Sequence, residues 1–137
     1  ETVQEEAHAR IAGVVSKCLA TVFDTPYEFH IRFRQARDRT EAELVFVRDG
    51  QDINPIDASG GGVVDVAAFA LRLSSLMLSR PPRRRVMVLD EPFRFVSQNY
   101  RENVQLMLEE LSRDLGVQFI MVTHIAELQC GTVIDLG

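Results

Sequence analysis

The stretch Val86-Met87-Val88-Leu89-Asp90-Glu91-Pro92 joins a valine-rich apolar run to two adjacent carboxylates and a proline. A continuous apolar run bounded by polar residues is typical of a strand covered on both faces in a parallel sheet. Because successive side chains of a strand point to opposite faces, Asp90 and Glu91 can serve different purposes. The stretch predicts a buried strand over Val86–Leu89 that presents two acids at its carboxyl end. An acidic turn that merely ends a strand is the structural alternative.

A second buried strand is predicted over Val117–Val122, and it ends at Thr123-His124. The residues between the two strands have the spacing of an amphipathic helix. Its apolar face comprises Tyr100, Val104, Met107, Leu108, Leu111 and Leu115, and Gly116 is placed to cap it. Strand, helix and strand form a βαβ unit, and ligands of open α/β sheets bind at the carboxyl ends of the strands. We also expect a helical turn at Ile125–Leu128 and a last strand at Thr132–Leu136.

A run of glycines, Ser59-Gly60-Gly61-Gly62, comes immediately before a predicted helix over Val63–Leu78 that is apolar on almost all sides. Glycines let backbone N–H groups approach an anion, and the start of a helix adds a favourable dipole. The run is therefore a candidate phosphate site that needs no lysine. A flexible linker or a helix cap is the alternative, and the run taken alone favours it.

The leading part of the chain predicts a helix followed by a hairpin. Apolar residues recur every three or four positions over Glu5–Phe23, and Asp24-Thr25-Pro26 then breaks the helix. Apolar and polar residues alternate around Phe29–Phe33, and Glu41–Val47 is a second strand. A polar loop is expected from Asp49 to the glycine run. The arginines Arg32, Arg34, Arg37 and Arg39 form either a phosphate-facing patch or a charged edge strand.

Composition limits what the chain can be. With 137 residues and 46% hydrophobic content it is one domain or part of one. A net charge of -5 means that its surface as a whole does not attract nucleic acid, so any DNA contact must be local. Cys18 and Cys130 lie far apart in sequence, which gives little support to a disulfide or a zinc site. No apolar run has membrane-spanning length and no signal peptide is evident, so a cytoplasmic protein without a membrane partner is expected.

Three motifs in this order resemble those of one family. Ser59-Gly60-Gly61 resembles the signature motif of ABC-type ATPases, Val86–Glu91 resembles Walker B, and Val122-Thr123-His124 resembles the H-loop. The leading helix and the hairpin that opens at Tyr27 resemble the place where the coiled coil re-enters the head of SMC and SbcC-type ATPases. Leu89-Asp90-Glu91-Pro92 is similar to the DNA-repair and phage recombination branch.

The resemblance implies an α/β fold: the C-terminal lobe of an ABC-type, P-loop ATPase head, with a mainly parallel sheet, flanking helices and a leading β-hairpin. Residues 1–23 would be the end of a coiled coil and residues 24–137 the lobe itself. The cofactors would be ATP and Mg²⁺. Asp90 would hold the magnesium, Glu91 would orient and deprotonate the attacking water, and His124 would contact the γ-phosphate. Ser59, Gly60, Gly61 and Gly62 would bind the ATP of an opposing subunit. For His124 alone, capping the next turn is the more frequent role.

Two departures from the family pattern are visible. The aspartate expected in the D-loop corresponds to Ser97, which leaves the signalling role of that loop open. The sequence also has no Gly-x-x-x-x-Gly-Lys-Ser/Thr motif, and Lys17 is its one lysine. The Walker A lobe is thus missing, and the chain by itself is expected to be inactive until it joins its own N-terminal Walker A lobe.

Three functions remain open on this basis. The first is the ATPase subunit of a DNA repair and recombination exonuclease, whose partners would be a second copy of the head, an SbcD-type nuclease subunit and DNA. The second is an SMC-, RecN- or RecF-like ATPase that tethers or organises DNA without a nuclease. The third is a head that dimerises on ATP and scarcely hydrolyses it, which the presence of Glu91 disfavours.

Overall fold

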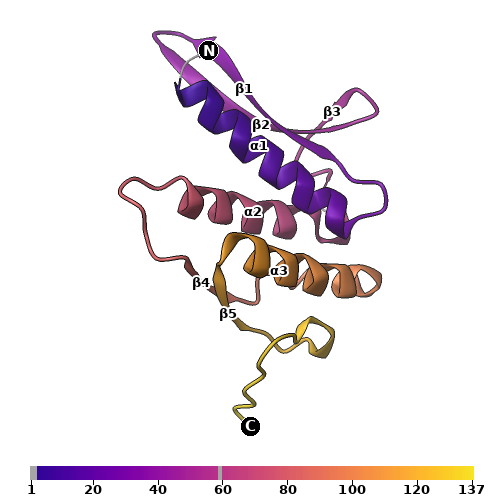
Figure 1. Ribbon diagram of the computed structural model, residues 1–137. Helices are drawn as coiled ribbons and strands as arrows, with labels where there is room; N and C mark the ends of the chain where they lie inside the picture. The colour runs from indigo at the N-terminus through magenta and orange to yellow at the C-terminus, as the bar shows by residue number, and fades with distance from the viewer. Residues whose placement is uncertain (1–2, 59) are drawn as a thin grey trace.

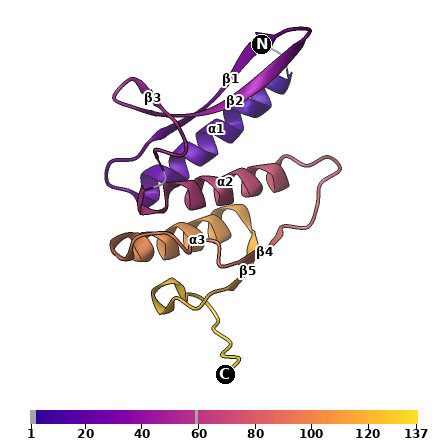
Figure 2. The ribbon, with the colours of Figure 1, turned by 180° about the vertical axis from the view of Figure 1, so that it is seen from behind.

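A computed structural model describes residues 3–58 and 60–137 as three packed helices, of which the first contacts the other two, with one small sheet along the first helix and a second toward the C-terminal end (Figures 1 and 2). In chain order the elements are α1 (Val3–Val22), β1 (Glu28–Ala36), β2 (Arg39–Arg48), β3 (Gln51–Ile53), η1 (Gly60–Gly62), α2 (Val63–Met77), β4 (Val86–Asp90), η2 (Gln98–Tyr100), α3 (Arg101–Leu115), β5 (Gln118–Val122) and η3 (Ala126–Leu128). The predicted α/β fold class, with flanking helices and a leading hairpin, is confirmed, and its sheets are small.

The first sheet is antiparallel, in the order β1-β2-β3. Strands β1 and β2 pair from Glu28 opposite Val47 to Ala36 opposite Arg39, and they lie along α1 in both views (Figures 1 and 2). Phe29 and Phe46 are buried and stack edge to face, with ring centroids 5.7 Å apart. These two aromatic side chains attach the hairpin to the core, whereas most residues toward its tip are exposed.

Helix α1 is buried along one stripe of its second half. Val15, Cys18, Leu19 and Val22 recur at helical spacing and are almost fully buried against the rest of the molecule. Most of the first half is exposed, as expected of a solvated helix. Burial raises the pKa of the Cys18 thiol to about 11, so this cysteine is a packing residue rather than a nucleophile at neutral pH.

The core lies between the helices and the covered face of β4 and β5. Phe93 and Phe69 stack edge to face at its centre, with centroids 5.2 Å apart, and Phe69 also contacts Phe119. The fully buried large side chains are Val15, Leu19, Val22, Val66, Leu73, Leu89, Phe93, Val96, Val104, Met107, Val117 and Leu128. Residues 60–77 are apolar and long enough in composition to cross a membrane, but α2 supplies much of this core, as a central helix of a globular domain does.

Three details of the secondary structure differ from expectation. The predicted strand Thr132–Leu136 does not form, and Ile134 and Leu136 are exposed there because no neighbouring strand offers them a ladder. Asp49 and Gly50 both have positive φ and close a two-residue hairpin turn into β3, where a polar loop was expected. The parallel part of the sheet comprises only β4 and β5 within the described residues, and antiparallel pairing is the more extensive.

The expectation that Val86–Leu89 is covered on both faces is also wrong for this chain. Exposure alternates along β4, so that Met87 and Leu89 are buried while Val86 and Val88 are exposed. The same alternation on β5 leaves Ile120 47% exposed. The physical reason is that the helices pack on one side of the pair, and none of the described residues forms a second layer on the other side.

Candidate functional site

The carboxyl ends of β4 and β5 bring two of the sequence-predicted residues together. The strands run parallel, with Asp90 opposite Val122, so the residues that follow them emerge at the same edge. The Glu91 amide then donates a hydrogen bond to the Val122 carbonyl at 2.8 Å, which extends the ladder by one step. Glu91 and His124 thereby become neighbours although 33 positions separate them in sequence.

The Glu91 carboxylate is oriented by the segment that follows β5. Its Oε1 accepts a hydrogen bond from the backbone N–H of His124 at 2.7 Å, and its Oε2 accepts one from the Thr123 hydroxyl at 3.2 Å. Glu91 itself has a φ of 44°, in the left-handed region that non-glycine residues seldom adopt. A left-handed residue at the end of the strand turns the side chain toward β5, and such outliers concentrate at functional sites.

His124 is presented to solvent beside this carboxylate. Its Nε2 lies 3.7 Å from Glu91 Oε1, and its side chain is 93% exposed while that of Glu91 is only 21% exposed. A carboxylate offers about four lone-pair sites. The two hydrogen bonds from Thr123 and His124 therefore leave Glu91 free to accept a further donor, such as a water molecule.

Thr123 is a residue whose role sequence reasoning missed. Its hydroxyl donates to Glu91 and also accepts a hydrogen bond from the Ile125 amide at 3.1 Å. This one side chain therefore fixes both the carboxylate and the turn that carries His124. Its place directly before the histidine was the available signal, but sequence alone does not show which atom a threonine hydroxyl contacts.

Asp90 stands on a different face from Glu91. It is exposed on the uncovered side of β4 together with Val86 and Val88, and its carboxylate makes no hydrogen bond or ion pair with any of the described residues. No group of three or more potential metal ligands gathers in residues 3–58 and 60–137. An isolated carboxylate suits Mg²⁺, which commonly takes one or two protein carboxylates and completes its shell with waters and substrate phosphates.

The glycine run is a packed turn at the start of α2, where Gly62 is the N-cap residue. Gly61 and Gly62 have φ values of 73° and 89°, and a Cβ at Gly62 would lie 2.4 Å from the Cα of Val96. The Ser97 amide donates to the Gly61 carbonyl at 3.1 Å, so the D-loop position contacts the run directly. Ser59 lies outside the described residues. The contacts of Gly61 and Gly62 are with this loop rather than with Glu91 or His124.

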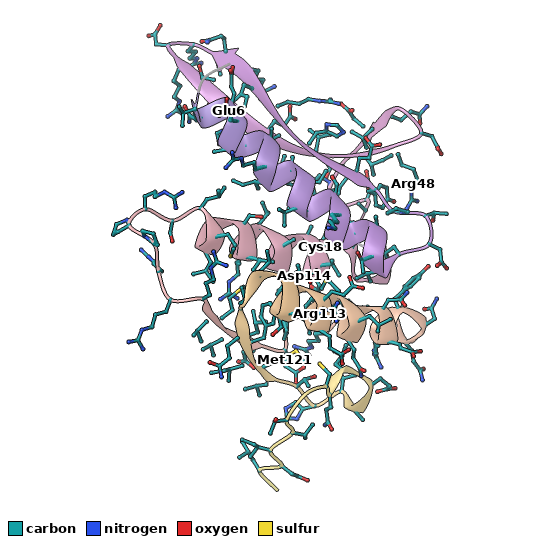
Figure 3. All side chains as sticks on the ribbon, viewed as in Figure 1. Glu6, Cys18, Arg48, Arg113, Asp114 and Met121 are labelled. Carbon is teal, nitrogen blue, oxygen red and sulfur yellow. The ribbon has the colours of Figure 1, made fainter. Side chains whose placement is uncertain are left out.

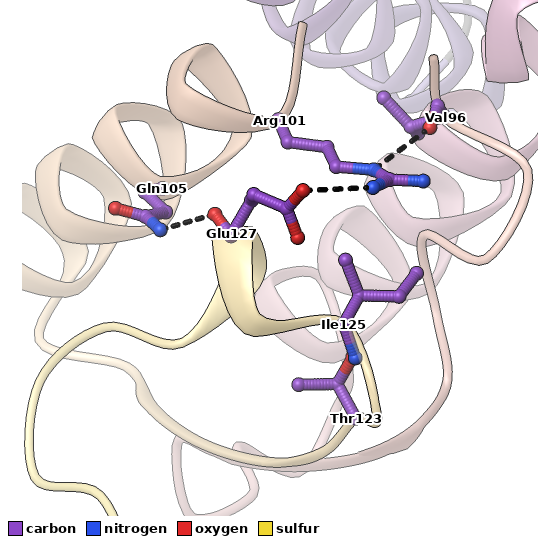
Figure 4. A network of polar contacts seen from close by, with 6 residues as sticks. All are labelled: Val96, Arg101, Gln105, Thr123, Ile125 and Glu127. Atoms are coloured by element: carbon purple, nitrogen blue, oxygen red, sulfur yellow. Dashed lines mark hydrogen bonds and ion pairs between the residues drawn. The ribbon is translucent and has the colours of Figure 1, made fainter. Parts of the chain in front are cut away.

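A polar network joins the same loop to the turn after His124 (Figure 4). Arg101, at the start of α3, donates to the Val96 carbonyl at 3.2 Å and lies 3.4 Å from a carboxylate oxygen of Glu127. Gln105, one turn further along α3, donates to the Glu127 carbonyl. The loop after β4 and the turn after β5 are therefore both anchored on the first turns of α3, which holds the candidate site in shape.

No protein-family model matches the chain. Curated relatives include the spermidine/putrescine import ATP-binding protein PotA of Marinobacter nauticus, 32% identical over 96 residues that make up 69% of this chain and 24% of that protein. The achromobactin transport ATP-binding protein CbrD of Dickeya dadantii is 27% identical over 121 residues, or 86% of this chain and 42% of that protein. The chain thus spans about a quarter of the first relative and less than half of the second.

Solved structures with the same fold are heads of SMC proteins. One, from work on ATP-driven dimerization and DNA-stimulated activation of SMC ATPases, has a TM-score of 0.67 at 17% identity and covers 92% of this chain and 74% of its own. The SMC head domain from Thermotoga maritima has a TM-score of 0.60 at 20% identity, covering 90% of this chain and 40% of its own. At such identities the likeness concerns the fold.

The solved SMC heads share the fold of this chain, and the sequence similarity to ABC ATP-binding proteins covers the larger part of it. Together these likenesses support the C-terminal region of an ABC/SMC-type ATPase head. The same comparisons do not separate an SbcC type from other SMC-like heads.

Proposed function

We propose that this chain is the C-terminal half of a cytoplasmic, ATP-hydrolysing head that dimerises on ATP and acts on DNA as SMC-type proteins do. One observation carries the proposal: Glu91 is held at the carboxyl ends of two parallel strands by Thr123 and by the backbone of His124. Ligands of open α/β sheets bind at that edge. A turn that merely ended the strand would not require Glu91 to adopt a left-handed backbone and to accept hydrogen bonds from the segment after β5.

The residues divide the chemistry between them. Glu91 accepts the proton of the attacking water, for which its carboxylate has free lone pairs and a fixed orientation. His124, exposed beside it, reaches the γ-phosphate. Asp90 holds the Mg²⁺ ion, which neutralises phosphate charge when it is bound.

The bare face of β4 and β5 supports an N-terminal Walker A lobe as the first partner. Parallel strands occur almost only with both faces covered. Here Val88 is 61% and Val122 is 50% exposed on the side that also carries Asp90. A lobe that covered this side would bury Val88 and Val122, and the same contact would bring its phosphate loop to Asp90.

Val88→Asp should therefore weaken association between this chain and its N-terminal lobe by tenfold or more, because a charge would be buried without a partner. Co-purification of the two lobes, followed by calorimetry, measures the effect. Leu106→Asp is the matched control, since Leu106 is likewise exposed, at 50% against 61% for Val88, but lies on α3. Equal affinities for the two variants would count against the bare face as the docking surface of the lobe.

A second copy of the head is the next partner, contacted through Ser59, Gly60, Gly61 and Gly62. In this arrangement the glycine turn of one head meets the ATP held by the other. An isologous two-fold dimer would complete two sites at once. The hydrogen bond between Ser97 and Gly61 supports such coupling, because it joins the turn to the loop that follows Walker B within one head.

Ser59→Arg in the two-lobe protein should leave ATP binding by a single head intact and abolish ATP-dependent dimerisation, because a bulky cation would stand where the neighbour's γ-phosphate enters. Sedimentation with and without ATP, alongside a nucleotide-binding assay, separates the two effects. Ser112→Arg, at an exposed position of α3, is the control. If the Ser59→Arg protein still dimerises on ATP, the glycine turn serves only as the cap of α2.

A nuclease-associated, SbcC-like role is the second candidate, favoured by Pro92 immediately after the two acids. Head closure is a two-state change that can gate a docked partner. In that case the complete protein would stimulate cutting of linear DNA by an SbcD-type nuclease, in a manner that requires ATP and Glu91. ATP-dependent bridging of DNA without any cutting would favour the tethering role instead.

A further inference from the structure

A cluster of four arginines occupies the loop between α2 and β4, away from the candidate site. The loop reads Ser79-Arg80-Pro81-Pro82-Arg83-Arg84-Arg85, and all its arginines are exposed. Its side chains point outward at the left of the molecule (Figure 3). The sequence contains no aspartate or glutamate from residue 66 to residue 89, although the whole chain has a net charge of -5. This loop is therefore a local concentration of positive charge.

Two of these arginines have structural roles. Arg85 donates to the Leu115 carbonyl at 2.5 Å and so satisfies the end of α3, while its own carbonyl accepts from the Gln118 amide at 2.8 Å. Arg80 donates to the carbonyl of Ser79 at 3.2 Å. These bonds and the two prolines restrict the loop, which leads to the amino end of β4.

Arg83 and Arg84 are the unengaged members of the cluster. Their guanidinium groups make no hydrogen bond or ion pair with any residue in the described ranges 3–58 and 60–137. Some exposed arginines elsewhere have carboxylate partners, as Arg32 has Asp52 and Arg113 has Asp114, whereas Arg10 and Arg94 have none and stand singly in the sequence. Arg83 and Arg84 differ from these because they are adjacent and lie in a stretch without acidic residues.

We propose that this arginine loop binds the sugar-phosphate backbone of duplex DNA without reading its sequence. Arginine forks match phosphate oxygens, and phosphate contacts position a protein on DNA without specifying bases. Residues 79–85 include no aromatic or large apolar side chain, whereas a protein partner would require such anchors at the centre of its interface. The chemistry of the loop thus favours a polyanion backbone over an acidic protein.

The arginine loop and the nucleotide chemistry lie at opposite ends of the parallel strands. β4 spans five residues, so at about 3.3 Å per residue the two edges are roughly 15 Å apart. DNA at the loop would therefore leave Asp90 and Glu91 open. The inference draws on the proposed function for DNA as the ligand, but its test needs neither ATP nor a second lobe.

The test is fluorescence anisotropy of the purified chain with a short labelled duplex, over a series of salt concentrations. Arg83→Ala/Arg84→Ala should weaken binding roughly tenfold per lost phosphate contact at about 50 mM salt and reduce the slope of log K against log salt by about 2. Arg10→Ala/Arg113→Ala carries the same charge change at exposed positions on α1 and α3, and should bind nearly as the parent does. Two duplexes of unrelated sequence should bind equally.

Three results would overturn the proposal: unchanged binding by Arg83→Ala/Arg84→Ala, an equal loss in Arg10→Ala/Arg113→Ala, or a parent chain that binds polyglutamate as tightly as duplex DNA. The last would identify the loop as a docking site for an acidic protein. Glu91→Gln should bind the duplex with unchanged affinity. Loss of DNA binding in the arginine variant can thus be separated from any failure of the ATPase proposal.

Discussion

Glu91→Gln, in the protein that joins this chain to its Walker A lobe, should lower the rate of ATP hydrolysis by about 10²- to 10⁴-fold while ATP still binds. The glutamine amide keeps the shape of the side chain, and its carbonyl oxygen can still accept the hydrogen bond from the His124 amide. It cannot accept the proton of the attacking water. ATP-bound dimers should therefore accumulate, which sedimentation with ATP would show beside a steady-state hydrolysis assay.

Glu110→Gln is the matched control, because this substitution is the same chemical change at an exposed position of α3. It should hydrolyse ATP at close to the parental rate. Turnover by Glu91→Gln at that rate would show that Glu91 is not the general base, and that its hydrogen bonds with Thr123 and His124 serve only to end the strand.

Gly62→Ala should destabilise the fold by about 2–5 kcal/mol, of which ~1–2 kcal/mol comes from the left-handed backbone and about 1–3 kcal/mol from overpacking. The backbone φ of Gly62 is 89°, and an added Cβ would lie 2.4 Å from the Cα of Val96. The Cα of Val96 is a backbone atom and cannot rotate away as the end of a side chain could. The loop after β4 would therefore have to move. Urea unfolding measures the loss, which is a large part of the ~5–15 kcal/mol that stabilises a typical domain.

Gly60→Ala, two residues earlier, is the control. Nothing lies within 4 Å of a Cβ built there, and its φ is not positive, so the change in stability should stay within about 1 kcal/mol. The pair of variants separates the two interpretations of the glycine run. A large effect confined to Gly62 assigns that glycine to packing, and equal small effects would indicate that the turn is looser than its contacts with Val96 and Ser97 imply.

The sequence predicted most of the local structure correctly, because local structure follows from periodicity and breakers. The helix before Asp24-Thr25-Pro26, the helix after the glycine run and the two strands that end in Asp90 and Val122 all form. So does the turn at Ala126–Leu128. A short strand at Gln51–Ile53 was missed, although Asp49-Gly50 is a strong hairpin signal, because the polar residues beyond it resemble a loop.

What sequence alone determined, then, is the order of the elements and the residue types placed at the strand ends, because both depend on neighbours along the chain. The three-dimensional arrangement is what shows that Thr123 contacts Glu91, that Gly62 is packed on Val96 and that one face of β4 and β5 is bare. Those facts concern residues about 30 positions apart, or a strand face that none of the described residues covers. No periodicity encodes them, because burial and hydrogen bonding depend on which surfaces meet in space.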